Sequence, residues 1–148
     1  MSKYLLVIPL YNEEEYIRNV ISKVREYFSK DVLVINDGST DKSSEILAEI
    51  EDITVIEQTE NCGYGCALMN GFKHAVNNNF EIVLTMDCDD QHEPHLIPNF
   101  LKEMGNNDIV SGSRYLNNST SLFEAPPPDR KKINKEMTEL INKYTGYN

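Results

Sequence analysis

Three aspartates follow directly on residues 80–86, an apolar run that predicts a strand: Asp87, Asp89 and Asp90. Alternate residues of an extended chain face the same side, so Asp87 and Asp89 can point the same way. Neighbouring carboxylates repel each other unless a cation lies between them, and hard oxygen ligands select Mg²⁺ or Mn²⁺. Gln91 can add a neutral oxygen or hold a bound water. The alternative interpretation is an acidic loop in which Asp90 or Glu93 stabilises the N-terminus of the next helix.

The motif VINDGSTD, residues 34–41, places Asp37 at the end of another apolar run. The Asp37 carboxylate can accept hydrogen bonds from a nucleobase or a ribose, and Gly38 allows the backbone to turn sharply. The alternative is a tight turn followed by a helix N-cap, because Asn, Asp, Gly and Ser are the usual residues of both. Taken without its neighbours, the motif favours the turn.

The motif PLYNEE, residues 9–14, adds an aromatic ring and acidic residues after a third apolar run. Tyr11 can stack on a nucleobase, and Glu13 can bind the polar edge of the base. The same pattern is typical of a strand that ends at Pro9 and leads into an acid-rich helix N-terminus. The two interpretations carry equal weight.

Two weaker motifs complete the set. Gly63 and Gly65 stand near the start of a predicted helix, where either a turn beside a ligand or a close contact between helix and sheet would need glycine. Arg114 lies beside small residues after a short apolar run. That setting suits a phosphate, although exposed arginines are common.

Short β-branched runs alternate with helical patterns along the chain. Strands are predicted at 4–8, 32–35, 53–56, 80–86 and 108–110. Helices are predicted at 13–28, after the cap residues 39–41, at 65–76 and at 94–104. This alternation predicts an α/β fold with a mostly parallel, doubly wound sheet and helices on both faces. Ligands of such folds bind beyond the carboxyl ends of the strands, where these motifs lie.

We expect a core domain at 1–116, a loop at 117–128 rich in Asn, Ser, Thr and Pro, and an amphipathic helical segment at 129–148. The last segment carries five basic and three acidic residues, in a chain whose net charge is −10. Its apolar positions repeat at helical spacing, as in helices that lie on a membrane surface or pack on a protein core. The chain ends directly after this pattern, so we expect a truncation on the C-terminal side.

The composition limits the classes of function. With 148 residues, of which 40% are hydrophobic and 26% charged, the chain can bury one core. A net charge of −10 argues against a nucleic-acid partner, which needs a basic surface. Three cysteines are an odd number and indicate a reduced, cytoplasmic setting rather than a disulfide framework. No run has the length of a signal peptide or a membrane span, so a membrane contact would be peripheral, at the inner face.

Five motifs occur in order along the chain: PLYNEE (9–14), VINDGSTD (34–41), NCGYGCALMNGF (61–72), MDCDDQHEP (86–94) and SGSRY (111–115). Together they resemble the motifs of family 2 glycosyltransferases, and more narrowly those of the polyprenyl-phosphate glycosyltransferases related to dolichyl-phosphate mannose synthase. The resemblance extends from about Leu6 to Asn148. It implies the Rossmann-like GT-A fold of nucleotide-diphospho-sugar transferases.

The resemblance also implies roles for the matching positions. The residues that would bind the nucleotide-sugar donor are Pro9, Tyr11, Glu13, Ile35, Asp37, Gly63, Asp87 and Cys88. The residues that would ligate a Mg²⁺ or Mn²⁺ ion bridging the diphosphate are Asp87, Asp89 and Gln91. Asp89 and Arg114 would be the catalytic residues, and Arg130 would lie on the acceptor side. Two positions depart from the family pattern, since Cys88 stands where Ala or Gly is usual and Asn36 where Asp is frequent.

The implied enzyme moves a sugar from a UDP- or GDP-sugar to an acceptor, with inversion at the anomeric carbon. A polyprenyl phosphate is the expected acceptor, because its oxygen is already ionised and needs no general base. Such an enzyme would serve polysaccharide biosynthesis for the cell envelope, and a homo-oligomer is compatible with the sequence. The alternatives are a saccharide hydroxyl as the acceptor, or a noncatalytic module that binds nucleotide sugars. A phosphatase or phosphotransferase with two aspartates fits less well, because Asp90 stands where such enzymes usually have Thr or Val.

Overall fold

The computed structural model of the chain describes residues 3–112 and 128–146. Contacts divide the chain into two compact units, Met1–Gly105 and Asn106–Asn148. The first unit contains a sheet with its covering helices, and the second contains the long helix α5 (Pro128–Thr145). The first unit therefore holds nearly all the residues that the sequence singles out.

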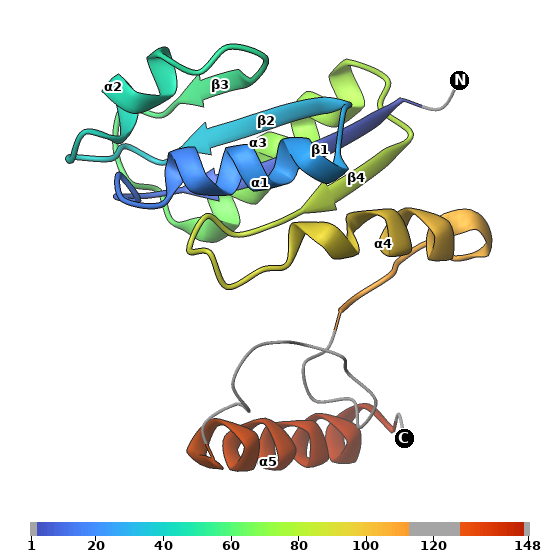
Figure 1. Ribbon diagram of the computed structural model, residues 1–148. Helices are drawn as coiled ribbons and strands as arrows, with labels where there is room; N and C mark the ends of the chain where they lie inside the picture. Colours follow the sequence, from blue (N-terminus) through green and yellow to red (C-terminus); the bar gives the residue numbers. More distant parts are fainter. Residues whose placement is uncertain (1–2, 113–127, 147–148) are drawn as a thin grey trace. The chain divides into compact units, whose positions relative to one another are not determined.

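Four parallel strands form the sheet of the first unit. They are β1 (Tyr4–Leu10), β2 (Asp31–Asn36), β3 (Thr54–Glu57) and β4 (Ile82–Thr85). Their order is β3-β2-β1-β4, so β1 and β2 lie in the centre (Figure 1). Because both faces of a central parallel strand are covered, these two strands are apolar at nearly every position. The parallel α/β fold expected from the sequence is confirmed.

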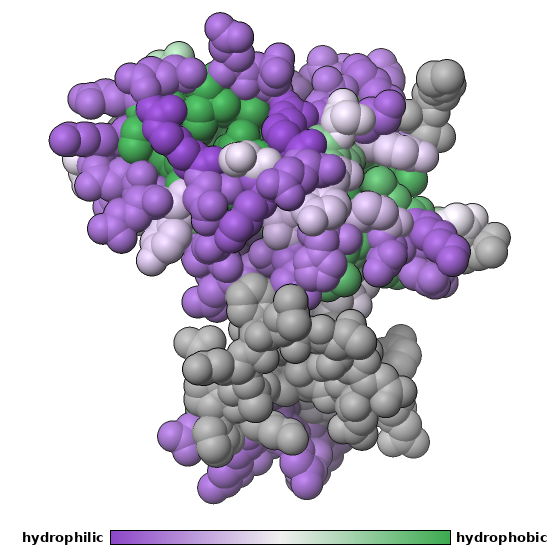
Figure 2. All heavy atoms as spheres, in the orientation of Figure 1, coloured by the Kyte–Doolittle hydropathy of each residue, from purple (hydrophilic) through white to green (hydrophobic). Residues whose placement is uncertain are grey.

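Helices cover both faces of this sheet. α1 (Ile17–Tyr27) lies on one face and α3 (Tyr64–Asn77) on the other (Figure 1). The shorter elements are α2 (Ser43–Ala48), the 3₁₀ turn η1 (Pro94–Leu96), α4 (Ile97–Glu103) and the 3₁₀ turn η2 (Met104–Asn106). Hydrophilic side chains cover most of the face of this unit that Figure 2 presents, with apolar ones visible between them over α2 and β3.

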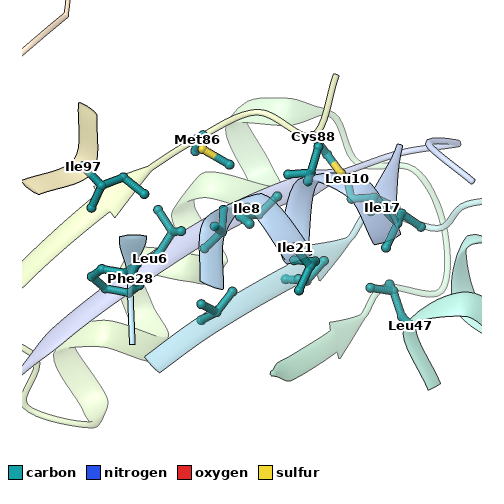
Figure 3. Close-up of a cluster of buried hydrophobic side chains, with 14 residues drawn as sticks. Leu6, Ile8, Leu10, Ile17, Ile21, Phe28, Leu47, Met86, Cys88 and Ile97 are labelled. Carbon is teal, nitrogen blue, oxygen red and sulfur yellow. The ribbon is translucent and has the colours of Figure 1, made fainter. Parts of the chain in front are cut away.

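Alternate residues of β1 supply two separate cores, because successive side chains of a strand point to opposite faces. The core on the α1 side contains Leu6, Ile8 and Leu10 of β1 with Ile17, Val20, Ile21 and Val24 of α1 (Figure 3). The core on the α3 side contains Leu5 and Val7 of β1, Leu33 and Ile35 of β2, and Ala67 and Ala75 of α3. The α3 core is built around small helix side chains, so this helix packs close to the strands.

Gly71 sets the distance between α3 and the sheet. A Cβ atom at this position would lie 2.5 Å from Cγ1 of Val7, which is too close for any real contact. Glycine therefore lets the helix backbone rest directly on β1. The close contact between helix and sheet, one of the two explanations for the glycines of this motif, is present at Gly71.

Pro9 does not end the first strand, contrary to the expectation, because β1 continues to Leu10. The Val7 carbonyl accepts a hydrogen bond from Met86 on the β4 side, and the Leu10 carbonyl accepts one from Asp37 on the β2 side. Backbone groups of alternate residues point to the same side, so the missing N–H of Pro9 faces the β4 side, as Val7 does. Pairing with β4 already ends at Val7, so the proline removes no sheet hydrogen bond.

The expected strand at 108–110 is also wrong, since the sheet within residues 3–112 has four strands and this segment is not one of them. Ile109 is 86% exposed. The composition of the run favours a strand, but a strand forms only where a neighbour binds its backbone groups.

The helix of the second unit, α5, carries apolar side chains that are exposed and repeat at helical spacing: Ile133, Met137, Leu140, Ile141 and Tyr144. Its charged residues include two pairs one helical turn apart, Lys132 with Glu136 and Lys135 with Glu139, each at 3.9 Å. Of the helices within residues 3–112 and 128–146, none combines the length and apolarity needed to cross a membrane.

Candidate functional site

The strands of the sheet end at one edge, because all of them run in the same direction. The loops that follow them begin at Tyr11 after β1, at Asp37 after β2, at Gln58 after β3 and at Met86 after β4. Hydrogen bonds connect the loops of β1 and β2, of β2 and β3, and of β4 and the start of α3. Four separate sequence motifs thereby form one continuous polar edge.

The residues after β4 alternate between core and surface. Met86 and Cys88 point into the core on the α1 side, where they are 6% and 3% exposed (Figure 3). Asp87 and Asp89 alternate with them and are partly exposed. Both carboxylates therefore leave the chain on the side opposite the core. We call residues 87–92 the acidic turn.

The Asp90 side chain binds α1 and holds the acidic turn against this helix. Its carboxylate accepts hydrogen bonds from Nζ of Lys23 at 2.7 and 2.9 Å and from Nδ2 of Asn19 at 3.1 Å. A φ of +57° places the Asp90 backbone in the left-handed region. The lysine neutralises this carboxylate, so Asp90 is not available as a helix cap, which was the alternative expected for it.

Asp87 has partners from two other segments. Its Oδ1 accepts a hydrogen bond from the hydroxyl of Tyr64, the first residue of α3, at 2.9 Å. Its backbone N–H donates to Nδ1 of His92 at 2.9 Å. Since Nδ1 accepts, the proton of the neutral ring is on Nε2, which lies 3.6 Å from Oδ2 of Asp87. The Tyr64 hydroxyl therefore holds Oδ1 of the carboxylate, and the His92 ring lies beside Oδ2.

The negative charge of Asp89 contributes to the pKa of several neighbouring groups. Burial raises the pKa of Glu13, and the carboxylates of Asp89 and Asp41 raise it further. Burial also raises the pKa of Cys88 to about 12, with contributions from Glu13 and Asp89. For Tyr64, burial, its hydrogen bond to Asp87 and the charges of Asp87 and Asp89 raise the pKa to about 12. Burial is the largest cause of all three shifts, and the neighbouring carboxylates raise each pKa further.

This negative region fits a divalent cation bound by oxygen. Within the described residues, no group of three or more His, Cys, Asp and Glu side chains is arranged to hold a metal ion. Mg²⁺ and Mn²⁺ do not need such a cage, because they are commonly held by one or two carboxylates, water and the phosphates of a substrate. Asp87 and Asp89 supply two carboxylates on one side of the chain, and a cation between them would relieve their repulsion.

The carboxylate of Asp37 binds the loop before α3 and is 3% exposed. Its Oδ1 accepts from the backbone N–H of Cys62 at 2.9 Å and from the side-chain amide of Gln58, and its Oδ2 accepts from the N–H of Gly63 at 2.8 Å. Gly63 precedes α3 with φ +90°, a conformation that favours glycine. Asp37 therefore fixes the start of α3, and its binding to a base or ribose stays a prediction.

Asn36, the residue before Asp37, is fully buried and makes four hydrogen bonds. Its Nδ2 donates to Oγ of Ser44 at 2.8 Å and to Oε2 of Glu57 at 2.7 Å. Its Oδ1 accepts from the backbone N–H and the hydroxyl of Ser39 at 3.2 and 2.5 Å. Every polar atom of the amide has a partner, so the side chain joins β3 to the loop before α2.

The loops after β1 and β2 are joined through backbone N–H groups. The N–H of Asn12 donates to Oγ of Ser39 at 2.9 Å, and the N–H of Glu13 donates to Oγ of Ser43 at 3.2 Å. The Tyr11 ring, in contrast, is 43% exposed. The two serines hold the backbone of the β1 loop and leave the Tyr11 ring accessible.

The sequence profile of Glycosyl transferase family 2 matches residues 5–147 of the chain. The chain belongs to this family. Among curated proteins, it is 32% identical to the undecaprenyl-phosphate 4-deoxy-4-formamido-L-arabinose transferase of Photorhabdus laumondii, with 99% of this chain and 45% of that protein covered. It is 30% identical to the UDP-N-acetylglucosamine–dolichyl-phosphate N-acetylglucosaminyltransferase of Methanococcus voltae, with 96% and 63% covered. The chain spans about half the length of the curated relatives it matches.

Solved structures establish the fold. TarS of S. aureus in complex with UDP superimposes with a TM-score of 0.57 and 24% identity, over 69% of this chain and 32% of that one. Glucosyl-3-phosphoglycerate synthase of Mycobacterium tuberculosis, in complex with Mn²⁺, UDP and phosphoglyceric acid, also has a TM-score of 0.57, with 23% identity over 72% and 40%. The family 2 chain has the GT-A fold expected from its motifs.

Three residues expected on the donor side have buried side chains. Pro9 and Ile35 lie within the central strands, and Cys88 lies in the α1 core. Ile35 is 0% exposed and packs toward α3. Any contribution of these three residues to donor binding would come from their backbone atoms or from the neighbouring residues that they hold in place. Gly63 differs, since a Cβ there would meet nothing within 4 Å, so a ligand can approach its backbone.

The other candidate residues are Gln91, Arg114 and Arg130. The Gln91 side chain is exposed, and its backbone N–H donates to Oδ1 of Asp89 at 3.0 Å. Arg114 lies outside the described residues. Arg130 belongs to α5, in the second unit.

Two residues at the site were not among the candidates, Tyr64 and His92. Tyr64 stands between Gly63 and Gly65 of the motif 61–72, and a large polar ring at that place is a signal that sequence reading could have used. His92 is the last residue of the acidic turn, but its bond to the Asp87 backbone depends on how the turn folds back.

Proposed function

We propose that this chain is the donor-binding part of an enzyme that transfers a sugar from a nucleotide-diphosphate sugar to a polyprenyl phosphate, with inversion. The observation that carries the proposal is the match of nearly the whole chain to relatives named as undecaprenyl-phosphate or dolichyl-phosphate sugar transferases. A UDP-sugar is the first donor to test, because the name of the M. voltae relative includes one and the TarS structure holds UDP.

In this proposal Asp87 and Asp89 hold a Mg²⁺ or Mn²⁺ ion against the diphosphate of the donor. When bound, the ion would neutralise the charge that develops on the leaving nucleoside diphosphate. The Tyr11 ring and the Glu13 carboxylate, at the neighbouring strand end, would bind the nucleoside. The Asp37 carboxylate orders the loop around Gly63, where the backbone is open to a ligand.

The transfer itself requires one displacement. The acceptor oxygen forms a bond to the anomeric carbon while the bond from that carbon to the diphosphate oxygen breaks, which inverts the configuration. A phosphate acceptor is already ionised at neutral pH, so no side chain has to remove a proton. The proposal therefore needs residues that bind and orient the donor, and it needs no base.

The first test is donor binding by this chain with and without Mn²⁺, measured by calorimetry with a panel of UDP- and GDP-sugars. Wild type should bind one nucleotide class more tightly when Mn²⁺ is present. Asp89→Ala should remove this metal dependence, because a single carboxylate remains. Identical titrations of Asp89→Ala with and without Mn²⁺ are expected, and an unchanged metal dependence would contradict the assignment.

The matched control is Asp90→Asn, in the same turn. Asp90 is bound by Lys23 and Asn19 of α1, so its substitution should lower stability and leave the metal dependence in place. If Asp90→Asn abolishes the dependence as fully as Asp89→Ala does, the cation is held differently from the proposal. If wild type binds no nucleotide sugar under any of these conditions, the proposal is wrong.

A further inference from the structure

Tyr64 makes a specific contact that its packing does not explain. The residue is 55% exposed, so its ring contributes little to the core. Its hydroxyl nevertheless donates to Oδ1 of Asp87 at 2.9 Å, across 23 positions of the sequence. The contact connects the first residue of α3 to the acidic turn.

The starting position of Tyr64 is itself well determined. Asp37 binds the N–H groups of Cys62 and Gly63, the two residues before it. Gly71, about two turns further along α3, rests on Val7 of the central strand. The tyrosine therefore projects from a helix that is held at its N-terminus and along its length, so the backbone from which its hydroxyl reaches Asp87 has a defined position.

The carboxylate of Asp87 needs such a partner. Its side chain is 37% exposed, so packing alone does not select one of its rotamers and a hydrogen bond can. The Tyr64 hydroxyl holds Oδ1, while His92 approaches Oδ2 at 3.6 Å. A carboxylate has about four lone-pair positions, so one hydroxyl leaves acceptor positions for a cation.

We propose that Tyr64 is a positioning residue, whose hydroxyl holds the Asp87 carboxylate in the orientation that binds a divalent cation together with Asp89. This inference rests on the proposed function, because it requires that the acidic turn binds a metal ion. Partners that orient metal ligands typically change metal affinity by about 10- to 100-fold. The exposure of Tyr64 places the expected effect at the lower end of that range.

The test is the affinity for Mn²⁺ in the presence of UDP, measured from the electron paramagnetic resonance signal of free Mn²⁺. Tyr64→Phe removes only the hydroxyl and should weaken Mn²⁺ binding about tenfold, with an unchanged melting temperature without metal. Tyr27→Phe, on an exposed tyrosine at the last turn of α1, is the matched control and should bind as wild type does. Equal or tighter binding by Tyr64→Phe would overturn the inference, and tighter binding would mean that the hydroxyl competes with the cation.

A double-mutant cycle with Asp87→Asn separates positioning from other effects of the ring. If Tyr64 acts through the Asp87 carboxylate, Tyr64→Phe should have no further effect on Mn²⁺ affinity in the Asp87→Asn background. The same loss in both backgrounds would overturn the inference. Absence of Mn²⁺ binding by wild type would instead refute the proposed function, so the two failures are distinguishable.

Discussion

At the scale of residues, the polar side chains of the sheet edge divide into two groups. Asn36, Asp37 and Asp90 bind other parts of the chain and hold the loops in place. Tyr11 and the carboxylates of Asp87 and Asp89 remain at least partly exposed at the same edge. The first group determines the positions of the second, so a substitution in it should change the stability of the fold.

Asn36 offers the sharpest test of this division. Asn36→Asp should lower the free energy of unfolding by about 2–3 kcal/mol, because the new carboxylate would face that of Glu57 and both amide donations would be lost. The measurement is urea denaturation at neutral pH. The amide of Asn36, at a position where the family often has Asp, therefore suits the carboxylate of Glu57 on β3.

The control for this prediction is Glu57→Gln. In the double variant Asn36→Asp with Glu57→Gln, the new amide can donate to the new carboxylate, and most of the lost stability should return. Should Asn36→Asp alone prove as stable as wild type, the pairing of Asn36 with Glu57 would have no part in stability.

At the scale of elements, the placement of α3 carries the site. This helix begins where Asp37 binds the Gly63 N–H, supplies Tyr64 to Asp87, and packs on β1 through Gly71. A displacement of α3 would therefore change the contact to the acidic turn as well as the core. The small side chains Ala67 and Ala75 on the same face keep the helix close to the sheet.

Gly71→Ala should destabilise the chain by about 1–3 kcal/mol, because the added Cβ would overlap with Val7. The matched control is Gly65→Ala in the same helix, where a Cβ would meet nothing within 4 Å. That change should leave stability unchanged or raise it by about 0.5–1 kcal/mol, since alanine favours a helix over glycine. The two variants are compared by urea denaturation. Equal effects would mean that helix propensity, and not the contact with Val7, determines the change in stability.

At the scale of the whole molecule, charge is distributed unevenly. The chain has a net charge of −10, while residues 129–148 carry five basic and three acidic residues. The exposed apolar side chains of α5 repeat at helical spacing in this same segment of the sequence. A helix of this kind can bind a membrane surface that contains anionic lipid, although packing on protein remains an equal interpretation of the same pattern.

We expect the chain to co-sediment with anionic lipid vesicles at low salt. Each basic residue near such a surface contributes about 1 kcal/mol, so replacing Lys131, Lys132 and Lys135 with glutamate should abolish binding. The matched control is the same triple change at Lys30, Lys73 and Lys102 in the first unit, which should have a smaller effect. Failure to bind anionic vesicles at any salt concentration would contradict a membrane role for α5.

The sequence by itself determined the order and type of the elements in the first unit. Buried strands and amphipathic helices have local patterns, which is why the parallel α/β fold and the alternation of Asp87 and Asp89 with buried residues followed from spacing. The side of a strand to which a backbone N–H or C=O group points, and whether a neighbouring strand lies there, do not follow from a local sequence pattern. Pro9 therefore remains within β1 because its missing N–H lies beyond the end of β4, and residues 108–110 form no strand because a strand needs a partner.

Only the tertiary structure decided which polar side chains bind each other. Asp37 meets Cys62 and Gly63 across 25 and 26 positions, and Tyr64 meets Asp87 across 23. These separations have no sequence period, because they depend on the lengths of the helices that return the chain to the same edge of a parallel sheet. The sequence therefore indicated which residue types could do chemistry, and the fold determined that Asp37 and Asp90 hold loops while Asp87 and Asp89 face outward.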